Sequence, residues 1–264
     1  MRIYPLYEFP KNIYQFKQLL LELDKYQPID KEDAIALVEK LFGKRTSRSE
    51  ITIRNLRDLG VLSGRDRLML SPETQLYLDM DKNLSNLLMF YVYKQPALFQ
   101  LCIDLIKIDG IMEMNNPLVL SQLYQMGYKE ERLGTGREKI YGIKRLVNCC
   151  LEENKEENPF LFYEKYQNFL EKLQETYFEL TKGKMGDAIP IVQLNDSLVE
   201  NYNFSISSIQ HFFEYLYNDI LHSRNIAFTT VNLEYAGLGY FAINQKNYYF
   251  IKLLSRILNE DTLF

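Results

Sequence analysis

Apolar residues recur at helical spacing in three consecutive segments near the start of the chain. They fall every three or four positions in residues 12–26, 31–42 and 47–59, which places them on one face of a helix. Pro28 separates the first segment from the second, and Gly43 follows the second, where a left-handed glycine commonly ends a helix. We therefore expect three short amphipathic helices in this part of the chain.

The third of these segments begins with a sequence typical of a helix start. Ser47 and Glu50 have the spacing of a capping box, in which each side chain accepts a hydrogen bond from the backbone N–H of the other. At 100° per residue, Ile53 lies on the inner side of this helix, whereas Arg54 and Asn55 point away from it. The third helix should therefore have an apolar inner face and a polar, arginine-bearing outer face.

A short β-hairpin is expected after the third helix. The apolar pair at residues 61–62 gives way to a polar turn at residues 63–66, and residues 67–70 then read as a second strand. Three helices followed by a small hairpin resemble the winged helix-turn-helix superfamily, and the resemblance covers residues 10–80. It implies that the third helix enters the major groove of duplex DNA while the hairpin, or wing, touches the adjoining backbone.

The rest of the chain repeats this plan imperfectly. Helical patterns are expected at residues 98–108, 117–126, 140–150, 160–180, 189–202 and 206–222, and strands at 226–233, 240–244 and 248–251. On the helix expected at 140–150, Arg145 should point outward, where it could extend the basic surface. Thr135 and Glu138 form a second capping-box pattern 88 positions after Ser47, which suggests an internal duplication. We therefore expect a mainly α fold with small β hairpins, built of tandem winged-helix-like units at residues 1–82, 83–155 and 156–264.

Charge is divided unevenly along the 264 residues. Residues 1–149 carry 22 Lys and Arg against 19 Asp and Glu, whereas residues 150–264 carry 9 against 16. The net charge of −4 excludes a uniformly basic nucleic-acid sleeve. Within residues 39–67, however, eight basic side chains stand against four acidic ones. A local basic face therefore coincides with the expected third helix and wing.

These positions supply the candidate DNA-binding residues. Side chains that could read base edges are Ser47, Arg54 and Asn55, and those that could meet phosphates are Lys44, Arg45, Arg48, Arg65 and Arg67, with Arg57 flanking the outer face. The alternative is a winged helix used for protein contact, in which the same charges form an ordinary solvated surface.

The last third of the chain points to a different partner, because it is acidic and rich in aromatic residues. Aromatic side chains often anchor the centre of a protein interface. The candidates for docking a protein partner or a second copy of the chain are Phe213, Tyr217, Tyr248, Tyr249 and Phe250. The equally weighted alternative is that these rings fill a joint between the second and third units.

Motifs for catalysis, cofactors and metals are absent from the sequence. The three cysteines and two histidines lack metal-ligand spacing, and the common hydrolase, P-loop and dinucleotide signatures are missing. Asp109 with Glu153 and Lys155 faintly resembles the carboxylates and lysine of a restriction-type nuclease. An ExK tripeptide is common, however, so we expect no catalytic residues, no cofactor and no metal.

The sequence also carries neither an apolar run long enough for a membrane span nor a secretion signal, so we expect a cytoplasmic protein without membrane contact. The chain plan and the stretch at residues 70–78 resemble the multi-winged-helix regions of bacterial defence and restriction systems, including antiviral ones. This implies a non-catalytic DNA-binding or adaptor protein. The alternative resemblance is to tandem winged-helix subunits that bind kleisin-type linkers in chromosome-maintenance or plasmid-defence complexes.

Overall fold

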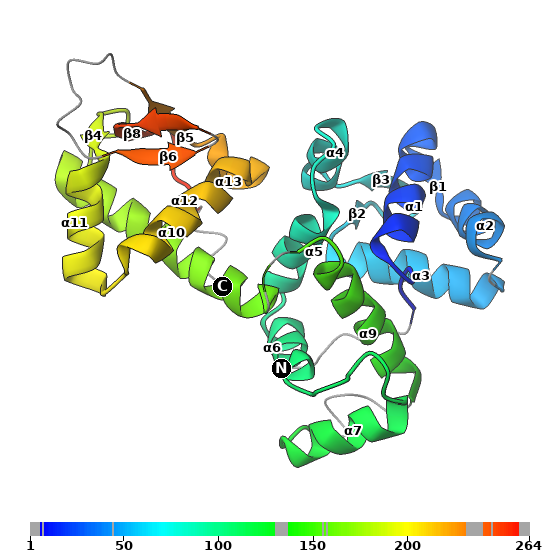
Figure 1. Cartoon of the computed structure of the whole chain (residues 1–264). Helices are drawn as coiled ribbons and strands as arrows, with labels where there is room; N and C mark the ends of the chain where they lie inside the picture. Colours follow the sequence, from blue (N-terminus) through cyan, green and yellow to red (C-terminus); the bar gives the residue numbers. More distant parts are fainter. Residues whose placement is uncertain are drawn as a thin grey trace. The chain divides into compact units, whose positions relative to one another are not determined.

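The chain is mainly helical and contains small antiparallel sheets of two or three strands, as the sequence predicts (Figure 1). The structure is a computed structural model. It describes residues 6, 8–43, 45–129, 137–154, 156, 158–230, 240–243 and 245–258, with the backbone alone at 137–139.

Two compact units make up the chain, residues 1–162 and residues 163–264. The expected boundary near residue 82 is wrong, because residues 1–82 and 83–155 belong to one unit. The expected boundary near residue 155 lies seven residues before the observed one.

The first unit opens with three helices and a three-stranded sheet. Its elements follow in the order α1 (Ile13–Tyr26), β1 (Ile29–Asp30), α2 (Lys31–Phe42), α3 (Thr46–Leu59), β2 (Leu62–Ser63) and β3 (Arg67–Leu70). The sheet order is β1-β3-β2, and both strand pairs are antiparallel, with Ile29 opposite Leu68 and Leu62 opposite Leu70. The strand β1, which the hydrophobic pattern did not predict, therefore covers the free edge of the expected hairpin.

Local sequence explains several ends of these elements. The Asn12 side chain caps α1 by accepting a hydrogen bond from the backbone N–H of Gln15 at 2.9 Å. Gly43 ends α2 in the left-handed conformation, with φ of 60°, as predicted. In the β2–β3 turn, Gly64 has φ of 88°, and a Cβ placed there would lie 2.0 Å from the carbonyl oxygen of Arg67. The turn therefore requires glycine at this position.

The start of α3 differs from the expected capping box. The helix begins at Thr46, and its N-cap is Arg45, whose side chain makes no capping hydrogen bond. Glu50 instead forms an ion pair with Lys31 on α2, 3.1 Å away. The capping-box prediction is wrong because this carboxylate faces the neighbouring helix rather than its own N-terminus.

The remainder of the first unit is helical. It contains α4 (Pro72–Asp79), α5 (Leu84–Tyr93), α6 (Pro96–Ile106), α7 (Asn116–Gln125) and α9 (Arg137–Leu151), and its described residues from 72 to 154 form no strand. The second capping-box pattern falls at Thr135, outside the described residues. The helix α9 packs against α1, α5 and α7, which joins this region to the first three helices.

The segment before α1 is held along α9 by backbone contacts. Arg145 donates to the carbonyl of Phe9 at 3.1 Å, and the Cys149 Sγ lies 3.8 Å from the carbonyl oxygen of Pro10. The backbone N–H of Ile13 donates to the Glu152 carboxylate at 2.6 Å. These contacts link residues more than 130 positions apart, and they explain why residues 83–155 do not form a separate unit.

The second unit is built around one long helix and the strands that follow it. The boundary between the units falls within α10 (Pro159–Thr181). The elements after it are β4 (Ile189–Pro190), α11 (Ile191–Tyr202), α12 (Ile206–Asn218), α13 (Ile220–Ser223), β5 (Ile226–Thr229), β6 (Phe241–Ile243), β7 (Lys246–Tyr248) and β8 (Phe250–Leu253). One sheet has the order β4-β8-β5, and β6 pairs with β7.

The two units repeat one arrangement at a spacing of 160 residues. The strands β1 and β4 begin at residues 29 and 189, the next helices at 31 and 191, and α3 and α12 at 46 and 206. The turn between these helices holds a left-handed residue in both units, Gly43 with φ of 60° and Asn203 with φ of 58°. In each sheet the last strand lies between the other two. The duplication suggested by the 88-residue spacing is therefore not the one that the fold shows.

A buried cluster centred on Asp219 breaks the helix that the sequence predicts for residues 206–222. The Asp219 carboxylate accepts hydrogen bonds from the Tyr166 hydroxyl at 2.9 Å and the Leu221 backbone N–H at 3.0 Å, and it lies 2.6 Å from His222 Nδ1. Burial alone would raise the pKa of this carboxyl. The attraction of His222 and the three hydrogen bonds outweigh burial, so the pKa of Asp219 lies below its usual value.

This cluster makes the second unit sensitive to acid. Because the folded-state pKa of Asp219 is below the unfolded value of about 3.9, its carboxylate contributes stability above that pH, and the contribution is lost as pH falls through the folded pKa. We expect the free energy of unfolding to fall below about pH 4, and to fall less steeply in D219N. Urea unfolding of both proteins at several pH values, followed by circular dichroism, measures this. Y166F removes one hydrogen-bond donor to Asp219, so the pH dependence of its free energy of unfolding should lie between those of the unchanged protein and D219N. Parallel pH curves for all three proteins would contradict the role given to Asp219.

Candidate nucleic-acid interface

The outward side of α3 carries much of the basic charge that the sequence singled out. Arg45, Ser47, Arg48 and Arg54 are all exposed, and α3 packs with its other sides against α2 and β2. Arg45 is the N-cap of α3 and Arg48 stands in its first turn, whereas Arg54 stands in the middle of the helix. These four positions are therefore accessible to a large partner, as expected.

The β2–β3 turn adds two exposed arginines. Arg65 lies in the turn itself, and Arg67 on β3 is paired with Asp30 at 3.6 Å, with both side chains about two-thirds exposed. Such an exposed pair contributes little to stability and is easily exchanged for another anion. We call Arg45, Arg48, Arg54, Arg65 and Arg67 the basic face.

Two further candidates have other surroundings. Arg57 is half-buried and lies 3.7 Å from the carboxylate of Asp58, its neighbour on α3. Lys44 lies outside the described residues. Neither is included in the basic face.

The prediction that Asn55 points outward is wrong. Its side chain is only 2% exposed, and its Nδ2 donates to the backbone carbonyl of Glu8 at 2.7 Å. The helical wheel placed Asn55 on the outer face because it assumed a single buried side. The chain before α1 covers a second side of α3, so Asn55 holds that segment and is unable to reach a base edge.

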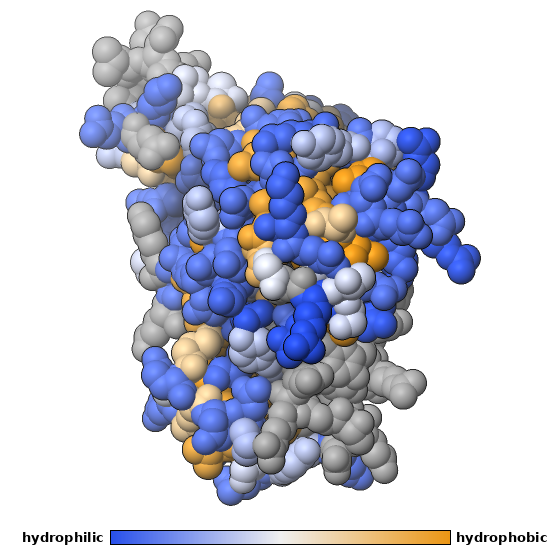
Figure 2. All heavy atoms as spheres, turned by 90° about the vertical axis from the view of Figure 1, so that its right-hand side faces the viewer, coloured by the Kyte–Doolittle hydropathy of each residue, from blue (hydrophilic) through white to orange (hydrophobic). Residues whose placement is uncertain are grey.

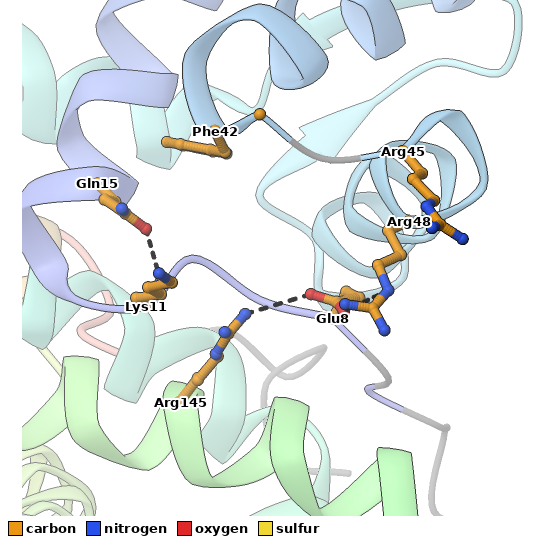
Figure 3. A pocket seen from close by; sticks show the side chains of 8 residues that line it. Glu8, Lys11, Gln15, Phe42, Arg45, Arg48 and Arg145 are labelled. Atoms are coloured by element: carbon orange, nitrogen blue, oxygen red, sulfur yellow. Dashed lines mark hydrogen bonds and ion pairs between the residues drawn. The ribbon is translucent and has the colours of Figure 1, made fainter.

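Glu8 is the centre of a charged cluster between this segment, α3 and α9 (Figure 3). Its carboxylate is buried and lies 3.2 Å from Arg145 Nη1 and 3.7 Å from Arg48 Nε. A buried carboxylate is costly unless it is paired and hydrogen-bonded. The two arginines therefore offset the cost of burying Glu8, and they join the first turn of α3 to α9.

Arg145 is itself largely buried, with 12% of its side chain exposed. Its guanidinium lies over the ring of Tyr141, 3.9 Å from the ring centroid, and donates to the Tyr141 hydroxyl as well as to the Phe9 carbonyl. The helical pattern of residues 140–150 predicts that Arg145 points to solvent, and this prediction is wrong. The covering segment converts an outward position of α9 into an interior one.

Sequence reasoning missed Glu8 and Lys11 as neighbours of the basic face, and it offered Arg145 only as an outward-pointing extension of a basic surface. They lie up to 137 positions apart, and they come together only because the chain before α1 runs between α3 and α9. No spacing in the sequence signals this. The one available clue is the acidic Glu8 within an otherwise apolar segment at residues 6–10.

Two of the five aromatic residues proposed for partner docking are buried inside the second unit. Phe213 is fully buried, and the centroid of its ring lies 4.9 Å from that of the Phe241 ring. Tyr248 is 7% exposed. These two predictions are wrong, because the rings fill the space between α12 and the strands. Tyr249 and Phe250 are half-buried, and Tyr217, at 37% exposed, remains open to solvent.

Other chemistry-bearing residues are dispersed. Burial raises the pKa of all three cysteine thiols, Cys102, Cys149 and Cys150, which leaves them protonated and poorly nucleophilic. Among the described residues, no three His, Cys, Asp or Glu side chains lie close enough to hold a metal ion. Asp109 and Glu153 are exposed, and Lys155 lies outside the described residues. No helix in the described part of the chain has the length and apolarity needed to cross a membrane.

Comparison with known proteins adds nothing to these observations: no family model, no curated protein and no solved structure matches the chain.

The Glu8–Arg145 pair should contribute strongly to the stability of the first unit. R145M removes one partner and leaves a buried carboxylate with less compensation, so we expect the free energy of unfolding to fall by about 3 to 5 kcal/mol. The double variant E8Q/R145M should lose less free energy of unfolding than the sum of the losses in the two single variants. The reason is that E8Q removes the buried carboxylate charge that R145M leaves with less compensation. Urea unfolding of the four proteins measures this coupling.

R57M serves as a matched control, since it removes an arginine whose ion pair with Asp58 is more exposed. R57M should lower the free energy of unfolding by less than about 1 kcal/mol. Strictly additive effects of E8Q and R145M would contradict the ion-pair assignment.

Proposed function

We propose that this chain binds duplex DNA through α3 and the β2–β3 turn of its first unit, and that it does so as a non-catalytic winged-helix protein. The observation that carries the proposal is the basic face. Five arginines are exposed on the two elements that a winged helix presents to DNA, in a chain whose net charge is −4.

The arrangement of residues 13–70 supports a winged-helix assignment. Three helices precede a short hairpin, α3 is followed by β2 after two residues, and β1 pairs with the hairpin to form one small sheet. In helix-turn-helix proteins the recognition helix lies in the major groove with its N-terminal residues at the base edges. Here Arg45 at the N-cap and Ser47 and Arg48 in the first turn stand at the N-terminus of α3, which fits that mode of docking, and Arg54 follows in the middle of the helix.

The roles of individual side chains follow from their positions. Arg54, exposed in the middle of α3, is placed to meet a base edge, and a bidentate arginine–guanine contact is the commonest specific one. Arg45, Arg48, Arg65 and Arg67 stand at the start of α3 and in the hairpin, where phosphate contacts fix register and orientation. Asn55 is not among the residues that we propose contact bases, because its side chain is buried.

The second unit repeats the arrangement without the charge. The helix α12, which corresponds to α3, contains no Lys or Arg and exposes Ile206 at 65% and Tyr217 at 37%. A helix of this composition is a poor phosphate binder. We therefore assign DNA contact to the first unit alone.

A second candidate function, a protein-interaction subunit, is favoured by an apolar area on the first unit. Figure 2 looks at the side of the molecule where α2 lies and shows apolar side chains grouped among hydrophilic ones. A pocket of about 470 Å³ on β1 and α2 is lined by Tyr26, Pro28, Ile29, Asp30, Asp33, Ala36, Leu37 and Lys40. Exposed apolar areas of this kind often mark binding sites for other proteins.

Salt-dependent binding of a short duplex, followed by fluorescence anisotropy, tests the DNA proposal. The full chain should bind with an affinity that falls steeply with salt. Replacing Arg45, Arg48, Arg65 and Arg67 together by Ala should weaken binding to every sequence and lower the salt slope by about 0.9 for each phosphate that is no longer neutralised. R54A should instead reduce discrimination between sequences, by about 1 to 3 kcal/mol if it removes a bidentate base contact.

The matched control replaces Lys25, Lys107, Lys182 and Lys184 by Ala. It changes the net charge by the same amount at exposed positions outside the basic face, and we expect a salt slope equal to that of the unchanged protein. Equal loss of DNA binding in both quadruple variants would mean that binding depends on net charge alone and not on the basic face. Unchanged binding in the arginine variant would reject the proposed surface in favour of the protein-interaction function.

A further inference from the structure

A polar pocket of about 510 Å³ lies beside the basic face, at the junction of the chain before α1, the α2–α3 connection and α9 (Figure 3). Every element that lines it belongs to the first unit. The lining residues are Glu8, Lys11, Gln15, Phe42, Gly43, Arg45, Arg48 and Arg145. The pocket therefore shares Arg45 and Arg48 with the basic face and adds two cations of its own.

The charge of this lining is strongly unbalanced. Four side chains are cationic and one, Glu8, is anionic. The Glu8 carboxylate already lies 3.2 Å from Arg145 and 3.7 Å from Arg48. The described part of the chain places no carboxylate within ion-pairing distance of the side chains of Lys11 or Arg45. The pocket thus holds an excess of positive charge that an anionic ligand would balance.

The start of α3 adds to this positive potential. Arg45, which lines the pocket, is the N-cap of this 14-residue helix, and its side chain makes no capping hydrogen bond. The first hydrogen bonds of this helix run from the N–H groups of Arg48 and Ser49 to the carbonyl of Arg45. The positive end of the helix dipole therefore lies beside the cations that line the pocket.

We infer that this pocket binds the phosphate of a small phosphorylated molecule. Clustered arginines recognise phosphate through paired, charge-assisted hydrogen bonds. The volume is within the range of small-molecule sites, about 300 to 1,000 Å³, which leaves room for an organic group beside the phosphate. Phe42, which is half-buried, lines the pocket away from Arg145 and Glu8 (Figure 3).

A phosphate could also come from a DNA backbone, but the geometry favours the small molecule. Arg145 lines the pocket with only 12% of its side chain exposed, and Lys11 belongs to neither α3 nor the hairpin. A duplex lying along α3 contacts exposed groups rather than a recessed cation. The inference also stands independently of the proposed DNA binding, because it can be tested in the absence of DNA.

Isothermal titration calorimetry of the full chain with pyrophosphate and with ADP tests this inference. We expect saturable binding of one ADP per chain, with a Kd below about 1 mM at 0.15 M salt. Replacing Lys11 and Arg45 together by Ala should weaken it more than about tenfold, because each removes a charged donor. Both side chains are exposed, so the variant should fold, and its thermal unfolding checks this. R54A, which removes an arginine of the same helix outside the pocket, should bind as the unchanged protein does.

Failure of both probes to bind would overturn the inference. Equal affinity in the Lys11 and Arg45 variant would do the same, since it would place the bound ligand elsewhere. A third result would also contradict it: if K11A lowered duplex affinity as much as R54A does, the phosphate in this pocket would belong to DNA. Loss of duplex binding in the arginine variants alone concerns the basic face and leaves the pocket assignment standing.

Discussion

The buried pairing of Glu8 with Arg145 is the interaction on which the first unit depends. A carboxylate with 8% of its surface exposed and a guanidinium with 12% exposed are stable in the interior only when they neutralise each other and satisfy their remaining hydrogen-bonding groups. Here Arg145 also binds the Phe9 carbonyl, and Asn55 binds the Glu8 carbonyl. One charge pair thereby fixes the chain before α1 between α3 and α9.

This constraint has consequences for both proposed sites. It covers one side of α3, so that Asn55 becomes structural while Arg45, Arg48 and Arg54 remain open to solvent. It also places Arg145 and Lys11 beside the first turn of α3, which creates the cationic pocket. The basic face and the pocket therefore result from one packing arrangement, and they are distinguished by which cations a partner can reach.

The sequence predicts the helices well where one apolar stripe decides the structure. Phe16, Leu19 and Leu23 of α1 are all buried, and the glycine that ends α2 has the expected conformation. The sequence does not predict β1, because a strand of two residues shows no periodicity. It does not predict the boundary between the units either, because the contacts between residues 8–13 and the region of α9 join residues far apart in the sequence. The inward positions of Asn55 and Arg145 were missed for the same reason: a helical wheel assumes one buried face, and these helices have two.

The two units repeat one arrangement of helices and strands at a 160-residue spacing, but they do not repeat one surface. The two units share their order of elements, the left-handed residue between paired helices and the placement of the last strand. Their surfaces differ, because Arg48, Arg54 and Arg57 of α3 correspond at this spacing to Ser208, Glu214 and Tyr217 of α12. The fold alone therefore predicts no shared partner, and function has to be argued from each surface separately.

Hydrogen–deuterium exchange of the full chain, with and without a saturating duplex, is the sharpest test of DNA binding through α3 and the β2–β3 turn. It reports on each segment in the unmodified protein. DNA should slow exchange in α3 and in the β2–β3 turn, while α12 and β5 should exchange as they do without it. Protection confined to the second unit, or no protection in residues 46–70, would contradict this mode of binding.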